Sequence, residues 1–226
     1  MSDILELKNI EQYFFQGKNK VSVLEKLNLT IKRSSKIAIM GASGSGKSSL
    51  LNIASLMEIP KSGEIYFLGK NVLVFSDNTK SDIRKSSIGY LHQRNPLLAE
   101  FNAFENIYIS LLLNNFNKKY AMERVNELLD AVGMLGRAKH LPSSMSGGEQ
   151  QRIAIARAIG NNPELVIADE PTGNLDNKNS LKIINQLIKV SNNNNTALLL
   201  ATHDDLVADK MDTVYKLTNG NLKKIK

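Results

Sequence analysis

The stretch MGASGSGKSSLLN, Met40–Asn52, joins an apolar run to a segment with helical character. Its first part, GASGSGKS, matches the pattern G-x-x-x-x-G-K-[ST] in the strand–loop–helix context that this pattern requires. Glycines let the backbone curl so that successive N–H groups point at phosphate oxygens, and the following helix adds its positive N-terminal end. The sequence therefore predicts a binding loop for a nucleoside triphosphate, formed by Gly41, Ala42, Ser43, Gly44, Ser45, Gly46, Lys47, Ser48 and Ser49.

Lys47 and Ser48 carry the chemistry expected of this loop. A lysine at this place reaches the β- and γ-phosphates, and the hydroxyl of the next serine ligates Mg²⁺. A turn rich in glycine and serine that precedes a helix by chance is the alternative. The apolar run before the loop and the helical segment after it favour the phosphate-binding interpretation.

A second motif, LVIADE, places two carboxyl groups at the end of another apolar run. Ligands of open α/β sheets bind at the carboxyl ends of the strands. We therefore expect Asp169 to hold the Mg²⁺ shell and Glu170 to polarise the attacking water as a general base. The alternative is that both carboxylates merely cap the turn before Pro171, but adjacent acids repel each other unless a metal lies between them.

Apolar patterning predicts an α/β fold. Residues 36–40, 164–169 and 196–202 contain continuous apolar runs, which are typical of parallel strands covered by helices. Alternation in LELKNI and LNLTIK predicts antiparallel strands near the N-terminus. Asn219-Gly220, between two short strand patterns, predicts a hairpin near the C-terminus.

Two segments show helical periodicity. In residues 119–133, Gly133 is expected to end a helix whose inner face is formed by Ala121, Met122, Val125, Leu128, Leu129 and Val132. A second helix is expected from about Ser180 to Val190, with an inner face of Leu181, Ile184, Leu187 and Ile188. No strand pattern appears between Pro96 and Ile159, so this block is expected to be a mostly helical insertion.

Composition narrows the classes of function. The chain of 226 residues has no cysteine, which excludes disulfides and thiolate metal sites. The net charge of +7 comes from scattered lysines without a dense basic block, which favours a solvated basic surface over nucleic-acid binding. The N-terminus lacks the pattern of a secretion signal, and no apolar run approaches the ~20 residues of a membrane span. Any role at a membrane is therefore expected to come through a partner.

The segment SMSGGEQQRIAIARAIGNNPELVIADEPTGNLD, Ser144–Asp176, resembles the ABC ATPases, and further family elements follow in order along nearly the whole chain. The resemblance implies one ABC ATPase domain over residues 1–226, with a P-loop fold of mainly parallel sheet and helices. Residues 1–95 and 160–226 would form the nucleotide-binding core with an N-terminal antiparallel β subdomain. Residues 96–159 would form the helical subdomain that carries the family signature.

The resemblance assigns the signature to Ser146, Gly147, Gly148, Glu149 and Gln150. Glu149 stands where many members have glutamine. In the family, this motif faces the γ-phosphate bound by the opposite subunit of a head-to-tail homodimer, so the resemblance implies such a nucleotide sandwich. Ser146 and Glu149 also match a capping box. Capping the helix is compatible with a role at the γ-phosphate.

Other matched positions complete the implied site. Gln93 matches the glutamine that links the metal to the membrane partner, and Asp176 matches the aspartate that crosses the dimer seam. His203 matches the switch histidine at the γ-phosphate, so Lys47, Glu170 and His203 form the implied catalytic group. The family also stacks adenine on an aromatic residue near the N-terminus. Counting along the chain favours Phe14, but Tyr13 is adjacent and the choice stays open.

ADEPTGNLD points to the ABC branch of lipoprotein-release, macrolide-export and cell-division complexes, and HQRNPLLAEFNAFENI resembles the lipoprotein-releasing members. The implied function is a peripheral subunit at the cytoplasmic face of a bacterial inner membrane, which binds ATP and Mg²⁺ and hydrolyses ATP. It would power lipoprotein release through integral membrane subunits that dock near Gln93 to Asn106. A macrolide-type exporter, a division complex and a soluble regulatory ATPase are the alternatives. Within the docking segment the apolar candidates are Leu97, Leu98, Phe101 and Phe104.

Overall fold

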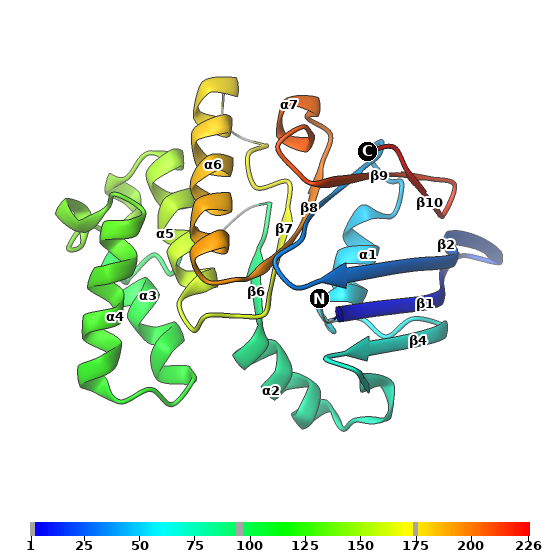
Figure 1. Ribbon diagram of the computed structural model, residues 1–226, viewed down its shortest axis with the longest axis horizontal. Coiled ribbons are helices and arrows are strands. Elements are labelled where there is room, and N and C mark those ends of the chain that lie inside the picture. The colour runs from blue at the N-terminus through cyan, green and yellow to red at the C-terminus, as the bar shows by residue number, and fades with distance from the viewer. Residues whose placement is uncertain (1–2, 94–96, 174–175) are drawn as a thin grey trace.

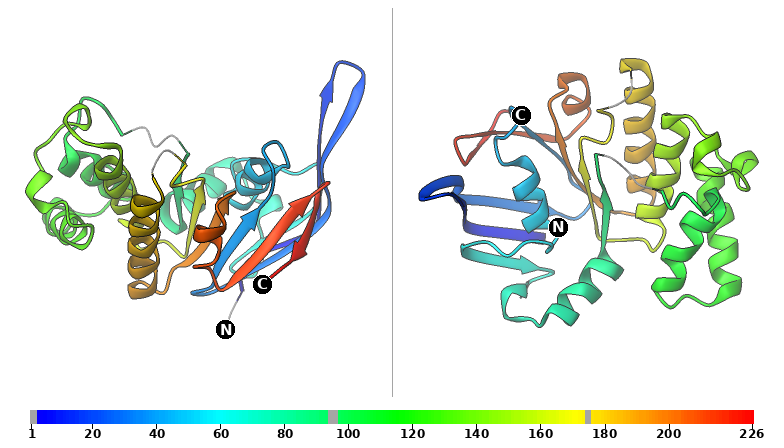
Figure 2. Two further views of the ribbon diagram at one scale, coloured as in Figure 1. Left: turned by 90° about the horizontal axis from the view of Figure 1, so that it is seen from above. Right: turned by 180° about the vertical axis from the view of Figure 1, so that it is seen from behind.

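A four-stranded antiparallel sheet forms the N-terminal part of the protein, with strand order β2-β1-β4-β5. The structure is a computed structural model that describes residues 3–93, 97–173 and 176–226. The strands are β1 (Asp3–Gln16), β2 (Asn19–Lys32), β4 (Ser62–Phe67) and β5 (Lys70–Asn71). β1 and β2 form a long hairpin, as their alternating pattern predicts, and its end extends beyond the rest of the molecule (Figure 2).

A six-stranded sheet crosses the centre of the molecule in the order β10-β9-β3-β8-β7-β6. Its strands are β3 (Lys36–Met40), β6 (Ile88–Leu91), β7 (Leu165–Asp169), β8 (Ala197–Thr202), β9 (Thr213–Thr218) and β10 (Asn221–Lys224). Neighbours are parallel except for β9 and β10, which form the expected hairpin. Because β3, β8 and β7 are parallel neighbours, the segments that follow them leave the sheet along one edge.

The central strands are buried on both faces. Ala38 and Leu198 belong to a core shared with the large helices, whereas Ile39 and Leu199 belong to a core shared with α1 (Lys47–Ala54) and the antiparallel sheet. None of these four side chains is exposed to solvent. Since both sides of each strand need apolar residues, the sequence shows a continuous apolar run instead of alternation.

Helices α3 (Ala103–Leu113), α4 (Lys118–Ala131) and α5 (Gly147–Ile159) pack together at the end of the molecule away from the antiparallel sheet (Figure 1). α6 (Asn177–Asn193) packs against α5, and the short α7 (Asp205–Ala208) follows β8. Residues 97–159 contain no strand, as expected. The proposed boundary between residues 95 and 96 lies outside the described residues, and the division into subdomains stays a prediction.

The predicted inner helix faces are mostly buried, although Leu181 is only half-buried. Met122 is 45% exposed, so its predicted inward position is wrong. It lies one residue after the buried Ala121, and one residue corresponds to about 100° of rotation around a helix. Nothing in the apolar pattern indicates α2 (Asp77–Ser87), because its one buried residue is Lys80. Within the described residues, no helix is both long and apolar enough to cross a membrane.

Candidate functional site

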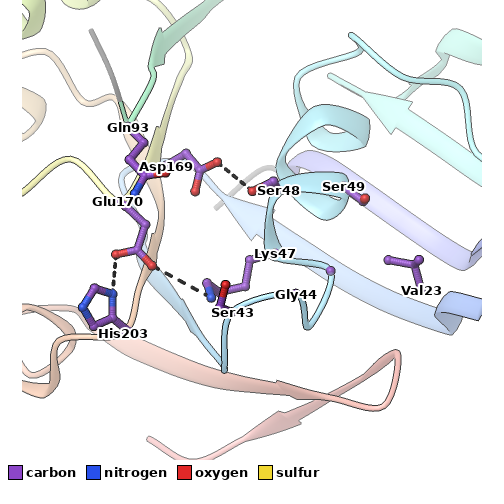
Figure 3. Close-up of a pocket in the computed structure, with 11 residues that line it drawn as sticks. Val23, Ser43, Gly44, Lys47, Ser48, Ser49, Gln93, Asp169, Glu170 and His203 are labelled. Atoms are coloured by element: carbon purple, nitrogen blue, oxygen red, sulfur yellow. Dashed lines mark hydrogen bonds and ion pairs between the residues drawn. The ribbon is translucent and has the colours of Figure 1, made fainter. Parts of the chain in front are cut away.

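Three loops meet at the edge of the central sheet where β3, β7 and β8 end (Figure 3). They enclose a cavity of about 640 Å³. The phosphate loop, the acidic pair and His203, which lie far apart in the sequence, all line this cavity. The lining residues are Val23, Ser43, Gly44, Gly46, Lys47, Ser48, Ser49, Gln93, Asp169, Glu170 and His203.

Two positions of the phosphate loop require glycine. Gly46 has a φ of 100°, which strains any other residue. A Cβ atom there would lie 2.8 Å from Val23 Cγ1 and 3.0 Å from the Val23 carbonyl oxygen. A Cβ atom on Gly41 would lie 2.8 Å from the carbonyl oxygen of Leu217. The loop is therefore held closely between β2 and β9, and α1 begins directly after it at Lys47.

The Lys47 ammonium group lies at the base of the loop. Its side chain is 9% exposed, and Nζ donates hydrogen bonds to the carbonyl oxygens of Gly41 at 2.7 Å and Ala42 at 3.1 Å. Nζ also lies 3.9 Å from Glu170 Oε1. These oxygens hold a positive charge beside the cavity, where phosphate oxygens of a ligand would meet it.

Ser48 and Asp169 place two oxygen ligands side by side. The Ser48 hydroxyl donates a hydrogen bond of 2.9 Å to Asp169 Oδ2. A hydroxyl and a carboxylate suit Mg²⁺, which takes one or two protein oxygens and completes its shell with phosphates and water. No group of three or more His, Cys, Asp or Glu residues in the described ranges is arranged to hold a metal ion without such help. The residues present therefore fit a Mg²⁺ ion that binds together with a nucleotide.

Glu170 lies between a cation and an imidazole. Its Oε2 is 2.7 Å from His203 Nδ1, and its Oε1 faces Lys47. The backbone of Glu170 is left-handed, with a φ of 46°, and its N–H donates to the carbonyl oxygen of Ala201 at 3.0 Å. Such a conformation costs about 1–3 kcal/mol in a residue other than glycine, and the surrounding fold must impose it.

Gln93 reaches the turn that follows the acidic pair. A Cβ atom on Gly173 would lie 3.8 Å from Gln93 Nε2. Residues 174 and 175 of the predicted GNLD loop lie outside the described residues. Asp176 caps α6: its carboxylate accepts hydrogen bonds from the backbone and side chain of Asn179, at 3.0 and 2.6 Å. The backbone N–H of Asn179 is the main cause that lowers the pKa of Asp176.

The signature residues line a different hollow, of about 460 Å³, formed by Gly133, Met134, Ser146, Gly147, Gly148, Glu149, Arg152, Asn179 and Ile183. It shares no lining residue with the cavity at Lys47. Ser146 and Glu149 form the predicted capping box at the start of α5. Within one chain, the structure thus does not bring the signature to the phosphate loop.

Phe14 and Tyr13 differ in what they face. Phe14 is paired with Val21, two residues before the cavity residue Val23, and is 47% exposed. Tyr13 is paired with Ser22, and the Lys20 ammonium lies 4.0 Å from the centre of its ring. Tyr13, Lys20 and Ser22 line another hollow of about 360 Å³ that does not include Val23. The register therefore places Phe14 on the face of the hairpin that Val23 shares and Tyr13 on the opposite face, and neither side chain lines the cavity at Lys47.

Residues 24–173 match the family model described as "ABC transporter". The chain belongs to the ABC transporter family. Its α/β architecture, with an antiparallel N-terminal sheet and helices after β6, is the P-loop fold of the ABC ATPases, and the chain is an ATP-hydrolysing subunit of that family.

Proteins of known name and solved structures are similar to this chain over almost its whole length. A protein of Rickettsia bellii (strain RML369-C) named "Lipoprotein-releasing system ATP-binding protein LolD" is 42% identical over 97% of each chain. A protein of the same name from Francisella tularensis subsp. tularensis (strain FSC 198) is 39% identical over 98% of this chain and 97% of its own. The ATP-binding cassette MJ0796, solved as a dimer in a post-hydrolysis state bound to ADP and Pi, is 33% identical, with a TM-score of 0.89 over 99% of both chains.

Two residues at or near the ABC site, Val23 and Tyr90, belong to none of the sequence motifs and were not predicted. Val23 closes one side of the phosphate loop although it lies in an ordinary alternating strand. Tyr90 lies on β6 opposite Ile167 of β7, and burial and then the Asp169 charge raise the pKa of its phenol to about 12. Its hydroxyl is 3.5 Å from Asn52 Oδ1, and its ring centre is 4.4 Å from that of His92. A tyrosine in a strand pattern does not by itself predict that its side chain is buried close to Asp169.

The predicted docking segment is partly core and partly surface. Leu97 is buried and Phe104 packs against the core, whereas Leu98 is 40% and Phe101 38% exposed. The fully buried Asn106 fixes their loop, because its Oδ1 accepts from the Leu98 N–H at 2.8 Å and its Nδ2 donates to the carbonyl oxygens of Leu98, at 3.1 Å, and Phe101, at 2.8 Å. Residues 94–96 of the segment lie outside the described residues.

Proposed function

We propose that this chain is the ATP-binding and ATP-hydrolysing subunit of a lipoprotein-releasing ABC transporter, attached to integral membrane subunits at the cytoplasmic face of a bacterial inner membrane. The observation that carries the ATPase chemistry is the meeting of Lys47, Ser48, Asp169, Glu170 and His203 around one cavity. The lipoprotein-releasing role is supported by relatives of that name at 39–42% identity over nearly full length.

In the proposed reaction, Lys47 binds the β- and γ-phosphates, and Ser48, Asp169 and Gln93 hold the metal side of the nucleotide. Bound Mg²⁺ supplies positive charge that offsets the charge of the phosphates. The water oxygen bonds to the γ-phosphorus as the bond from that phosphorus to the bridging oxygen breaks, which gives ADP and phosphate. The carboxylate of Glu170 accepts the water proton. His203 fixes the carboxylate through the 2.7 Å contact and faces the γ-phosphate.

We further propose that two chains form a head-to-tail sandwich in which Ser146, Gly147, Gly148 and Glu149 meet the nucleotide of the opposite subunit, with Asp176 at the seam. The N–H groups of Gly147 and Gly148, at the positive end of α5, support this. A Cβ atom on either glycine would contact nothing in the described part of the chain. The glycines are therefore not needed for packing within the subunit, and their openness suits an approaching anion.

Phe14 is the proposed adenine-stacking residue, because the β1–β2 register places it on the same face of the hairpin as the cavity residue Val23. Leu98 and Phe101 are the proposed apolar contacts for the membrane subunits. Both are exposed on a loop that Asn106 holds in shape. A rigid apolar loop of this kind suits a groove that receives a helix of a partner.

Replacing Glu170 by glutamine tests the proposed chemistry. The amide keeps the shape but accepts no proton, so ATP hydrolysis by the complex with its membrane subunits should fall by about 10² or more, while nucleotide binding persists. Glu127→Gln on the exposed side of α4 is the matched control and should leave the rate unchanged. A Glu170→Gln complex with near-normal turnover would contradict the assignment. Mass spectrometry of the co-purified membrane subunits tests the lipoprotein-releasing role against the alternatives.

A further inference from the structure

The two carboxylate oxygens of Glu149 have different partners. Oε2 accepts a hydrogen bond of 2.8 Å from the N–H of Ser146, which closes the capping box of α5. Oε1 lies 3.2 Å from Arg137 Nε. The Ser146 hydroxyl in turn accepts from the Glu149 N–H at 3.3 Å. One carboxylate therefore connects the signature serine to an arginine that lies outside the signature.

Arg137 is itself held in place. It ends the short 3₁₀ helix Leu135–Arg137, and its Nη1 lies 3.0 Å from His140 Nε2. The guanidinium side chain is 49% exposed and the Glu149 side chain 28% exposed, so solvent weakens the pair. A loop before the signature nevertheless presents a fixed positive charge to the one acidic side chain of the α5 first turn.

A carboxylate at the start of α5 has opposite effects on the proposed reaction. It stabilises the helix terminus, and the Ser146 backbone contact is the first cause that lowers the pKa of Glu149. In the proposed sandwich, however, the same negative charge lies where the γ-phosphate of the opposite subunit arrives, and like charges repel. A glutamine would cap the helix without that repulsion. The carboxylate therefore requires a compensating cation, and in the part of the chain that the structure describes Arg137 is the one that pairs with it.

We propose that Arg137 is a positioning residue of the ATPase site: it neutralises Glu149 and holds the Ser146 end of α5 in the shape that receives the γ-phosphate of the opposite subunit. This inference rests on the proposed function, since it assumes that the signature acts on nucleotide across the dimer. Arg137 touches neither nucleotide nor metal and acts through Glu149.

The test is a double-mutant cycle in the complex with its membrane subunits, with kcat and KM for ATP as readouts. Arg137→Gln should lower kcat about three- to fivefold, the scale of a solvent-exposed ion pair. ATP affinity of the isolated chain should not change, because Arg137 lies outside the cavity at Lys47. Arg137→Lys should keep more than half of the rate. In the Glu149→Gln background, where no carboxylate remains to neutralise, Arg137→Gln should change kcat by less than about 1.5-fold.

Arg33→Gln is the matched control. Arg33 pairs with Glu164 at 2.6 Å, with side-chain exposures of 41% and 31%, so this variant removes a similar ion pair remote from the signature. It should leave kcat unchanged. An equal loss for Arg137→Gln in the wild-type background and in the Glu149→Gln background would overturn the inference, and so would no loss in either.

If Arg137→Gln fails to fold, Arg137→Lys decides the matter, because a loss of kcat beyond about twofold despite the retained charge overturns the inference. A Lys47→Ala complex distinguishes failure of the proposed ATPase function from failure of the positioning role of Arg137. If it hydrolyses ATP at the wild-type rate, the proposed function itself fails. If it is inactive and the Arg137 variants behave like wild type, only the positioning role is wrong.

Discussion

Alanine at Gly46 should destabilise the protein more than alanine at Gly44, although both glycines belong to the same loop. Both have positive φ, 100° for Gly46 and 77° for Gly44. They differ in their surroundings, because a Cβ atom at Gly44 meets nothing within 4 Å, whereas one at Gly46 meets Val23. The pair of variants thus separates backbone strain from contact with β2.

The expected difference in unfolding free energy follows from the backbone strain and the contact with Val23. A left-handed conformation costs an L-residue about 1–2 kcal/mol, which applies to both variants. At Gly46 the Cβ atom would also lie 2.8 Å from Val23 Cγ1 and 3.0 Å from a backbone oxygen, which cannot move cheaply. Overpacking of this kind costs about 1–3 kcal/mol more. For a chain of this size, ~1 kcal/mol corresponds to about 2–4 °C in Tm, so Gly46→Ala should unfold roughly 2–12 °C below Gly44→Ala.

Thermal unfolding of the purified chain, followed by far- and near-UV circular dichroism, measures this difference. The two probes must give one coincident transition for the comparison to be valid, and urea unfolding provides a second estimate. Equal Tm values for the two alanine variants would refute the reasoning that the loop is held tightly against Val23. A Val23→Ala change in the Gly46→Ala background should recover part of the loss, because it removes the Cγ1 atom from the close contact.

Two further predictions concern the partners of the chain. Mixing inactive Lys47→Ala chains with inactive Ser146→Arg chains should restore about one of two sites in the proposed sandwich; no recovery in dimers confirmed by light scattering would contradict a site shared between subunits. Phe101→Glu should reduce co-purification with the membrane subunits, while ATP affinity and Tm stay unchanged. Leu113→Glu, at a 65% exposed position at the end of α3, should not reduce co-purification. An intact complex with Phe101→Glu would show that the docking surface lies elsewhere.

The motifs located most of the cavity from sequence because they mark strand ends. GASGSGKS and the two acids of LVIADE each follow an apolar run, and such ends meet at one edge of a parallel sheet. His203 also follows such a run, but the resemblance to the ABC ATPases selected it. The order β3-β8-β7 was not predictable in the same way, since the pairing of strands as far apart in the sequence as β3 and β8 leaves no local pattern. That order brings the segment after β8 to the same cavity as the other two loops, and His203 contacts Glu170 there.

Other features were hidden because their stabilising contacts are polar or involve backbone atoms. α2 begins with the Ser76 cap and presents hardly any apolar residue to the core, so periodicity does not reveal it. Asn106 looks like an ordinary polar residue on a helix, yet it is fully buried and satisfies the backbone of the preceding loop. Buried amides of this kind become recognisable only when the atoms they bind are known.

Glu170 shows how the fold separates two adjacent acids into two tasks. Neighbouring residues of a regular strand point to opposite faces of the sheet. Asp169 ends β7 regularly and its carboxylate meets Ser48. Glu170 departs from the strand with a φ of 46°, and its carbonyl oxygen accepts from the Gly173 N–H at 3.1 Å in the turn that follows.

This turn directs the second carboxylate toward Lys47 and His203 and away from the Ser48 side. The proposed metal ligand and the proposed base thereby meet different partners although they are adjacent in sequence. The strain of about 1–3 kcal/mol at Glu170 is thus linked to a particular arrangement of charge. A regular strand conformation at this residue would turn its carboxylate away from the two groups that orient it.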